Sequence, residues 1–182
     1  MTTQEKNGIT EGVIWKQLLI FFFPILVGSF FQQLYNTVDS VIVGQFVGKE
    51  ALSSVGGSAG QIISLVVGFF TGVSTGATVI ISQYFGAGKK EEIEESLHTA
   101  YAFALVGGLV LGIAGIVFAP QMLLWMNTPE ELIAESVLYV RVYFSGLIFI
   151  FIYNMGAAIL RAVGDSKRPL YYLIVCSVVN II

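Results

Sequence analysis

Long stretches of apolar residues with little or no charge dominate this sequence and limit what the chain can fold into. An α-helix needs about 20 mostly apolar residues to cross a bilayer. Such stretches lie at about residues 16–47, 51–85, 97–126 and 132–160, and another begins at 169 and runs to 182. Short polar segments rich in turn-forming residues separate them, as helix hairpins require. The pattern predicts an all-α, polytopic transmembrane helix bundle.

Composition supports a membrane protein and excludes several other classes. Hydrophobic residues make up 55% of the chain, charged residues only 12%, and the mean hydropathy is +0.82. Soluble domains carry about a quarter charged residues. The net charge of −3 leaves no basic surface for nucleic acid, so no nucleic-acid partner is expected. Cys176 is the only cysteine, which excludes an internal disulfide and a cysteine metal cluster.

No catalytic set is recognisable in the sequence. It contains no phosphate-binding loop, no nucleophile elbow and no zinc-protease motif, and the lone His98 follows a charged segment rather than joining a cluster. The chain is therefore not expected to be an enzyme.

The positive charges between the apolar stretches predict the orientation, because Lys and Arg near helix ends resist translocation. Only Lys49 falls in a loop on one side, and the cations of the other side are Lys6, Lys16, Lys89, Lys90, Arg161, Lys167 and Arg168. This bias predicts a multi-pass protein of the cell membrane, with residues 1–15 as a cytoplasmic segment and 16–182 in the membrane region. Arg141 remains inside the fourth stretch, where it is expected to snorkel outward or to pair with a carboxylate such as Glu135.

The fifth stretch is too short to cross a bilayer. From Leu170 to Ile182 there are 13 residues, against the ~20 needed. A helix ending there would leave unsatisfied carbonyls in hydrocarbon, at several kcal/mol each. The sequence therefore predicts that this helix is truncated.

Asp39 is the candidate for ion or proton handling, because an intramembrane carboxylate is costly and normally faces a bundle interior or a water-filled cavity. The alternative is a residue solvated at the outer end of its helix. At helical spacing Asp39 shares a face with Gln32, Tyr35 and Asn36. Such a polar stripe supplies oxygens to Na⁺ or hydrogen bonds that tune a carboxyl for proton exchange. Residue types alone do not choose between the two ions.

Further residues at membrane depth carry weaker signals. Pro24 with Gly28 marks the expected bend of the first helix, or a static kink. Asn154 and Asn180 are membrane-depth amides that either line a polar cavity or bridge helices. If both helices start at the membrane edge, Asp39 stands ~31 Å and Asn180 ~15 Å above it. The two then meet only if the first helix bends or tilts, or if the fifth begins below the membrane.

Glycines at four-residue spacing predict close helix packing. One set lies on the second stretch, at Gly68, Gly72 and Gly76, and another on the third, at Gly108 and Gly112.

Several segments in combination resemble multidrug and toxic compound extrusion (MATE) transporters. They are TEGVIWKQLLIFFFPILVGSFFQQLYNTVDSVIVGQFVGKEALSSVG, ISQYFGAGKKEE and LRAVGDSKRPLYYLIVCSVVNII. Members have twelve helices in two six-helix lobes. The resemblance implies that this chain supplies the first five helices, the fifth incomplete, of the amino-terminal lobe, and that the carboxy-terminal lobe is a missing partner.

The resemblance also implies a function: export of small organic, often cationic, compounds driven by Na⁺ or H⁺, with no other cofactor. Asp39 matches the first-helix aspartate of the family's cation site, Gln32 and Tyr35 match polar residues beside it, and Asn180 matches the fifth-helix asparagine, so Na⁺ would bind at Asp39 and Asn180. Pro24 matches the proline where the helix bends in some members. Ala157 departs from the amide of some members, and Asn154 is a weak substitute.

Other functions stay open at this point. A lipid-linked oligosaccharide flippase of the same superfamily would be expected to line its cavity with several basic residues, of which only Arg141 is available. A non-transporting membrane scaffold would need packing glycines but no buried carboxylate, so Asp39 argues against it.

Overall fold

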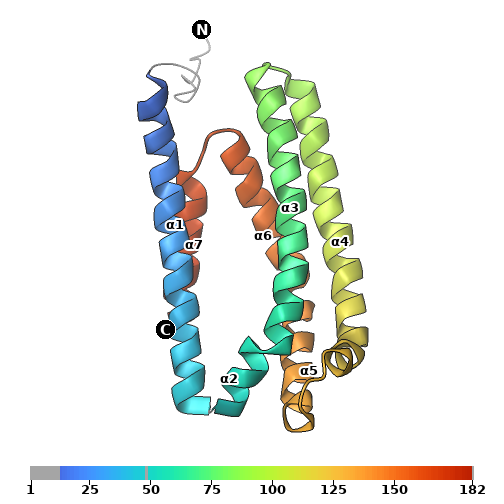
Figure 1. Cartoon of the computed structure of the whole chain (residues 1–182). Helices are drawn as coiled ribbons and strands as arrows, with labels where there is room; N and C mark the ends of the chain where they lie inside the picture. Colours follow the sequence, from blue (N-terminus) through green and yellow to red (C-terminus); the bar gives the residue numbers. More distant parts are fainter. Residues whose placement is uncertain (1–12, 48, 182) are drawn as a thin grey trace.

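The described part of the chain is helical almost throughout. The structure is a computed structural model that describes residues 13–47 and 49–181, and no strand occurs among them (Figure 1). The elements in chain order are α1 Ile14–Ile42, the π-helical turn η1 Val43–Val47, α2 Lys49–Gly56, α3 Ser58–Gly86, α4 Lys90–Trp125, α5 Glu130–Ser145, α6 Leu147–Ala162 and α7 Lys167–Ile181. The predicted all-α bundle is confirmed.

Three helical segments are long and apolar enough to cross a membrane: Ile14–Phe46, Leu52–Gly86 and Lys90–Trp125. The stretch predicted as one helix over 132–160 is instead a pair, α5 and α6, bent by 50°. Gly146 lies between the two helices and marks the point where the chain changes direction. At the end of the described chain α7 covers 15 residues, fewer than a crossing needs.

The second predicted helix, 51–85, is also interrupted, and Gly57 is the cause. Its backbone has φ −82° and ψ −131°, which ends α2 before α3 begins. A Cβ atom at this position would lie 2.6 Å from the carbonyl oxygen of Ser53, so any other residue would collide with the backbone. Hydropathy alone does not register this break, because apolar residues lie on both sides of it.

The helices form two groups. α3, α4, α5 and α6 pack on one another, whereas α1 packs mainly on α7, and α7 in turn contacts α6 (Figure 1). The start of α1, the turn between α3 and α4, and the turn between α6 and α7 all lie at one end, and α2 lies at the other. Lys89 and Arg168 therefore share an end, as the charge pattern requires.

Glycines on α4 provide the close packing that the sequence predicts. A Cβ atom at Gly115 would lie 1.7 Å from the Phe144 ring of α5, and one at Gly108 would lie 2.9 Å from the Cα atom of Ile148. The stripe on α3 differs, because Cβ atoms at Gly68, Gly72 and Gly76 would meet nothing within 4 Å. That face of α3 is open in the described part of the chain.

Arg141 has a structural partner that the sequence analysis did not foresee. Its Nε atom donates a hydrogen bond to the carbonyl oxygen of Ile116, at 3.2 Å. Ile116 lies four residues before Pro120 inside α4, and a proline has no N–H to satisfy that carbonyl. Glu135, the expected partner, accepts a hydrogen bond from Ser54 of α2 at 3.5 Å instead. Arg141 thus replaces the donor that Pro120 removes.

Candidate cation-coupling site

The polar stripe of α1 lies on one helix face, as predicted. Asp39 and Tyr35 are partly buried, while Gln32 and Asn36, one turn away from each, are exposed. Asp39 is the only acidic residue in the described part of α1 and η1. Its carboxylate and the Tyr35 hydroxyl are therefore the members of the stripe that face other helices.

Tyrosines of the neighbouring helices are the electrostatic neighbours of this stripe. The Tyr139 hydroxyl of α5 lies within electrostatic range of the Asp39 carboxylate. Tyr143 of α5 and Tyr153 of α6 lie within the same range of Tyr35. The rings of Tyr139 and Tyr143 lie with centroids 6.4 Å apart. Asp39 thus lies on the side of α1 that is turned toward α5.

The position at which α7 begins accounts for most of the expected difference in height, along the bundle axis, between Asp39 and Asn180. A Cβ atom at Gly28 would lie 3.5 and 3.7 Å from side-chain atoms of Leu173 and Leu170, respectively. These three residues therefore lie at about the same height along the bundle axis. Both helices begin at the same end (Figure 1), which places the Asn180 backbone about nine residues, or ~13 Å, beyond Gly28 and near the level of Asn36. α7 therefore begins deeper along α1, and neither a bend nor a start below the membrane is needed. The Asn180 side chain lies outside the described part of the structure.

Pro24 and Gly28 are the two buried residues of α1. Gly28 faces α7, and α1 runs through Pro24 as one helix from Ile14 to Ile42. The predicted bend at Pro24 stays a prediction.

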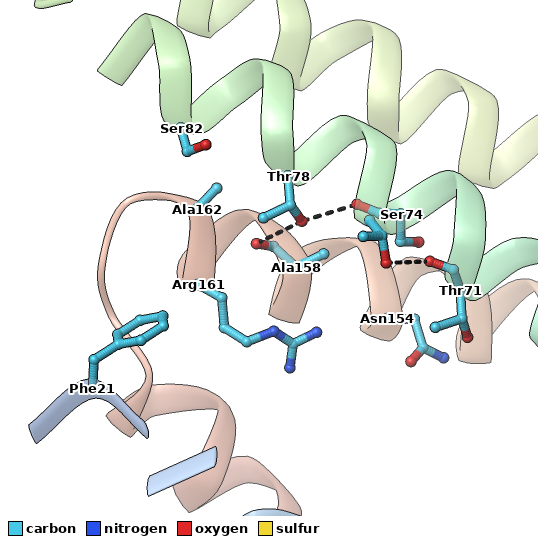
Figure 2. A pocket seen from close by; sticks show the side chains of 10 residues that line it. Phe21, Thr71, Ser74, Thr78, Ser82, Asn154, Ala158, Arg161 and Ala162 are labelled. Carbon is cyan, nitrogen blue, oxygen red and sulfur yellow. Dashed lines mark hydrogen bonds between the residues drawn. The ribbon is translucent and has the colours of Figure 1, made fainter. Parts of the chain in front are cut away.

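Asn154 does not join Asp39. Its side-chain amide donates to the carbonyl oxygen of Ile150 in its own helix, at 2.8 Å. It lines a separate cavity of about 340 Å³ with Arg161 of α6 and residues of α3 (Figure 2). Ala157 is buried one turn away from that amide.

A metal site built from several charged ligands is not found. The residues that the structure describes contain no group of three or more His, Cys, Asp or Glu side chains arranged so that they could hold a metal ion. A sodium ion at Asp39 would therefore rely on neutral oxygens, such as those of Tyr35 and Asn36, for its remaining ligands.

Comparison with known proteins identifies the family. The family model MatE matches residues 24–182. The chain belongs to the MatE family. Among curated proteins it is 32% identical, over 181 residues, to the probable multidrug resistance protein YoeA of Bacillus subtilis, and 33% identical over 174 residues to the probable multidrug resistance protein YpnP of the same organism. The matches cover 100% and 94% of this chain, and 38% of each relative.

Solved structures agree with this result. The crystal structure of MATE in complex with MaD3S superposes with a TM-score of 0.90 at 24% identity, covering 99% of this chain and 40% of that one. This likeness confirms the helical fold of a MATE transporter. The chain spans about two fifths of the length of the proteins it resembles, so the activity of the whole transporter is a matter for proposal.

Proposed function

We propose that the protein is a secondary antiporter of the MATE family, which exports small organic compounds in exchange for Na⁺ or H⁺, with Asp39 as the coupling residue. The observation that carries this proposal is the position of Asp39, partly buried on α1 and within electrostatic range of Tyr139 of α5. The names of the relatives, probable multidrug resistance proteins, support the substrate class.

The arrangement suits coupling because Asp39 lies on the side of α1 that is turned toward the other helix group. A ligand shifts a conformational equilibrium only if it binds one state better than the other. When Na⁺ or H⁺ neutralises Asp39, its partly buried side chain no longer carries an uncompensated charge, so a state that buries Asp39 more deeply becomes less costly. The equilibrium between the two positions of the helix groups then shifts toward that state. Outward and inward states would thus differ in their affinity for the ion.

The proposed orientation places the start of α1, Lys89 and Arg168 in the cytoplasm. The shared end of these three features supports it, because cations near helix ends remain on the cytoplasmic side. Export then requires ion entry from the opposite end, where α2 lies.

The test is gradient-driven transport by the reconstituted transporter that contains this chain. Vesicles are loaded with a fluorescent organic cation, and a Na⁺ gradient or a pH gradient is imposed separately. Asp39→Asn keeps the shape of the side chain and removes its titratable charge, so uphill transport is expected to be lost while the protein still folds. Glu131→Gln, at an exposed position in the first turn of α5, is the matched control and is expected to transport normally.

Three results would contradict the proposal. Normal uphill transport by Asp39→Asn would move the coupling elsewhere. Transport of a lipid-linked oligosaccharide without any ion gradient would favour the flippase, and no transport by the wild-type protein would favour a scaffold.

A further inference from the structure

A second polar site lies near the end of the bundle that carries the start of α1. The cavity of about 340 Å³ is lined by residues of three helices: Phe21 of α1, Thr71, Ser74, Thr75, Thr78 and Ser82 of α3, and Asn154, Ala158, Arg161 and Ala162 of α6 (Figure 2). Phe21 precedes Asp39 by 18 residues on α1, which is about 27 Å of helix. The cavity is therefore separate from the proposed coupling site.

Arg161 brings a permanent positive charge to this cavity. An arginine in the last turn of a helix can extend outward to the interface. The Arg161 side chain instead reaches back along α6 toward Asn154, and its guanidinium group is partly buried (Figure 2). Because a guanidinium does not lose its proton in proteins, burial at membrane depth calls for a compensating partner.

No carboxylate in the described part of the chain supplies that partner. The acid nearest in sequence, Asp165, pairs with Arg168 at 3.1 Å and accepts hydrogen bonds from the amides of Lys167 and Arg168. The electrostatic neighbour of Arg161 is the hydroxyl of Tyr153, which is neutral at physiological pH. The guanidinium is thus available to a ligand.

Ser74 is a second, independent sign of a ligand. It is only 4% exposed, it lines the cavity, and its hydroxyl has no hydrogen-bond partner within the described residues. Buried hydroxyls are normally hydrogen-bonded, because leaving one unpaired costs about 1–3 kcal/mol. The neighbouring Thr78 differs, since its hydroxyl contacts the carbonyl oxygens of Ser74 and Ala158 at 2.9 and 3.3 Å. Ser74 is therefore a free donor in the same cavity as Arg161.

We propose that this cavity binds the carboxylate of a small organic anion, with Arg161 as the bidentate partner and Ser74 as a further donor. Guanidinium and carboxylate match in geometry and charge. Phe21 offers an aromatic face to an apolar ligand body, and the volume lies at the lower end of the range for small-molecule pockets. The site goes beyond the proposed antiport, because carboxylate binding needs neither an ion gradient nor Asp39.

Equilibrium dialysis of the detergent-purified transporter with radiolabelled naphthoate tests the proposal, and its neutral analogue naphthamide tests the need for charge. Naphthoate is expected to bind, and naphthamide to bind at least about tenfold more weakly, since charge-assisted hydrogen bonds are strong. Arg161→Gln should weaken naphthoate binding by a similar factor, and Ser74→Ala by about threefold to tenfold. Arg168→Gln, which removes an exposed arginine at the same end, is the matched control and should bind normally.

Gel filtration shows whether each variant is folded. If Arg161→Gln does not fold, Arg161→Lys and Ser74→Ala decide, because both keep the overall charge and size of the cavity and both should weaken naphthoate binding. Equal binding of naphthoate and naphthamide, or unchanged binding in these variants, overturns the proposal. The proposal is also overturned if naphthoate does not bind and phospholipid copurifies with the wild-type protein but not with Arg161→Gln. In that case the cavity binds a lipid phosphate.

Discussion

Replacing Pro120 and Arg141 singly and together tests whether the arginine satisfies the carbonyl that the proline leaves unpaired. Arg141→Met keeps the apolar stem and removes the donor to the Ile116 carbonyl. Pro120→Ala restores a backbone N–H that can bond the same carbonyl. We therefore expect Arg141→Met to be more costly in the Pro120 protein than in the Pro120→Ala protein.

The magnitude follows from the geometry of the contact. The Nε–O distance of 3.2 Å is at the long end for such a bond. Hydrogen bonds to charged groups contribute about 1.5–3 kcal/mol in soluble proteins, and interhelical bonds in a membrane protein average about 0.6 kcal/mol. We expect a coupling free energy of about 1 kcal/mol between the two positions, such that Pro120→Ala reduces the loss of stability caused by Arg141→Met.

The measurement is a double-mutant cycle on the free energy of unfolding, followed by tryptophan fluorescence as SDS is titrated into mixed micelles. Trp125 ends α4, the helix that contains Pro120, and so reports on the right element. The reasoning is refuted if Arg141→Met changes the stability by the same amount in both backgrounds. Removing the arginine charge from the membrane also changes the stability by itself. This change is the same in the Pro120 and Pro120→Ala proteins, so it cancels in the cycle.

Three further outcomes are expected. Gly115→Ala should destabilise the fold by about 1–3 kcal/mol in the same titration, because its Cβ atom would overlap the Phe144 ring, whereas Gly68→Ala, with nothing within 4 Å, should be nearly neutral. In intact cells, in a protein without its native cysteine, an impermeant thiol reagent should label a cysteine replacing Asn127 but not one replacing Lys89; the reverse pattern would invert the topology. Vesicles that contain only residues 1–182 should show no coupled export, because an alternating-access cavity needs a second wall, and uphill export by this chain alone would contradict that expectation.

Composition and spacing predict the class of fold because the bilayer leaves few alternatives. A helix satisfies its own backbone, so a long apolar stretch already implies a span. The breaks at Gly57 and Gly146 were missed because hydropathy averages over about 19 residues and does not sense a single change of backbone direction. The break at Gly57 follows from a local backbone conformation that glycine permits, but glycines occur throughout the apolar stretches, so the sequence alone does not single out this one.

The same distinction applies to the candidate site: features within one helix can be predicted from the sequence, and contacts between helices cannot. The face shared by Tyr35 and Asp39 follows from helical periodicity within one segment. Their tyrosine neighbours Tyr139 and Tyr143 are about 100 residues away in sequence, so only the tertiary arrangement reveals them. Arg161 was placed among the cytoplasmic cations, and its turn back into a cavity depends on its rotamer. The spacing of Thr71, Thr75, Thr78 and Ser82 on one helix face was a signal that could have indicated a polar wall.

The packing of α1 on α7 affects the order in which the bundle assembles during synthesis. Gly28 meets its neighbour Leu170 only after about 140 more residues have been made. At ribosomal rates of about 5–20 residues per second, that interval is roughly 7 to 30 seconds. The first helix to emerge must therefore remain in the membrane with Gly28 uncovered by α7, whereas α3 and α4, which follow one another directly in the chain, can pack together much earlier.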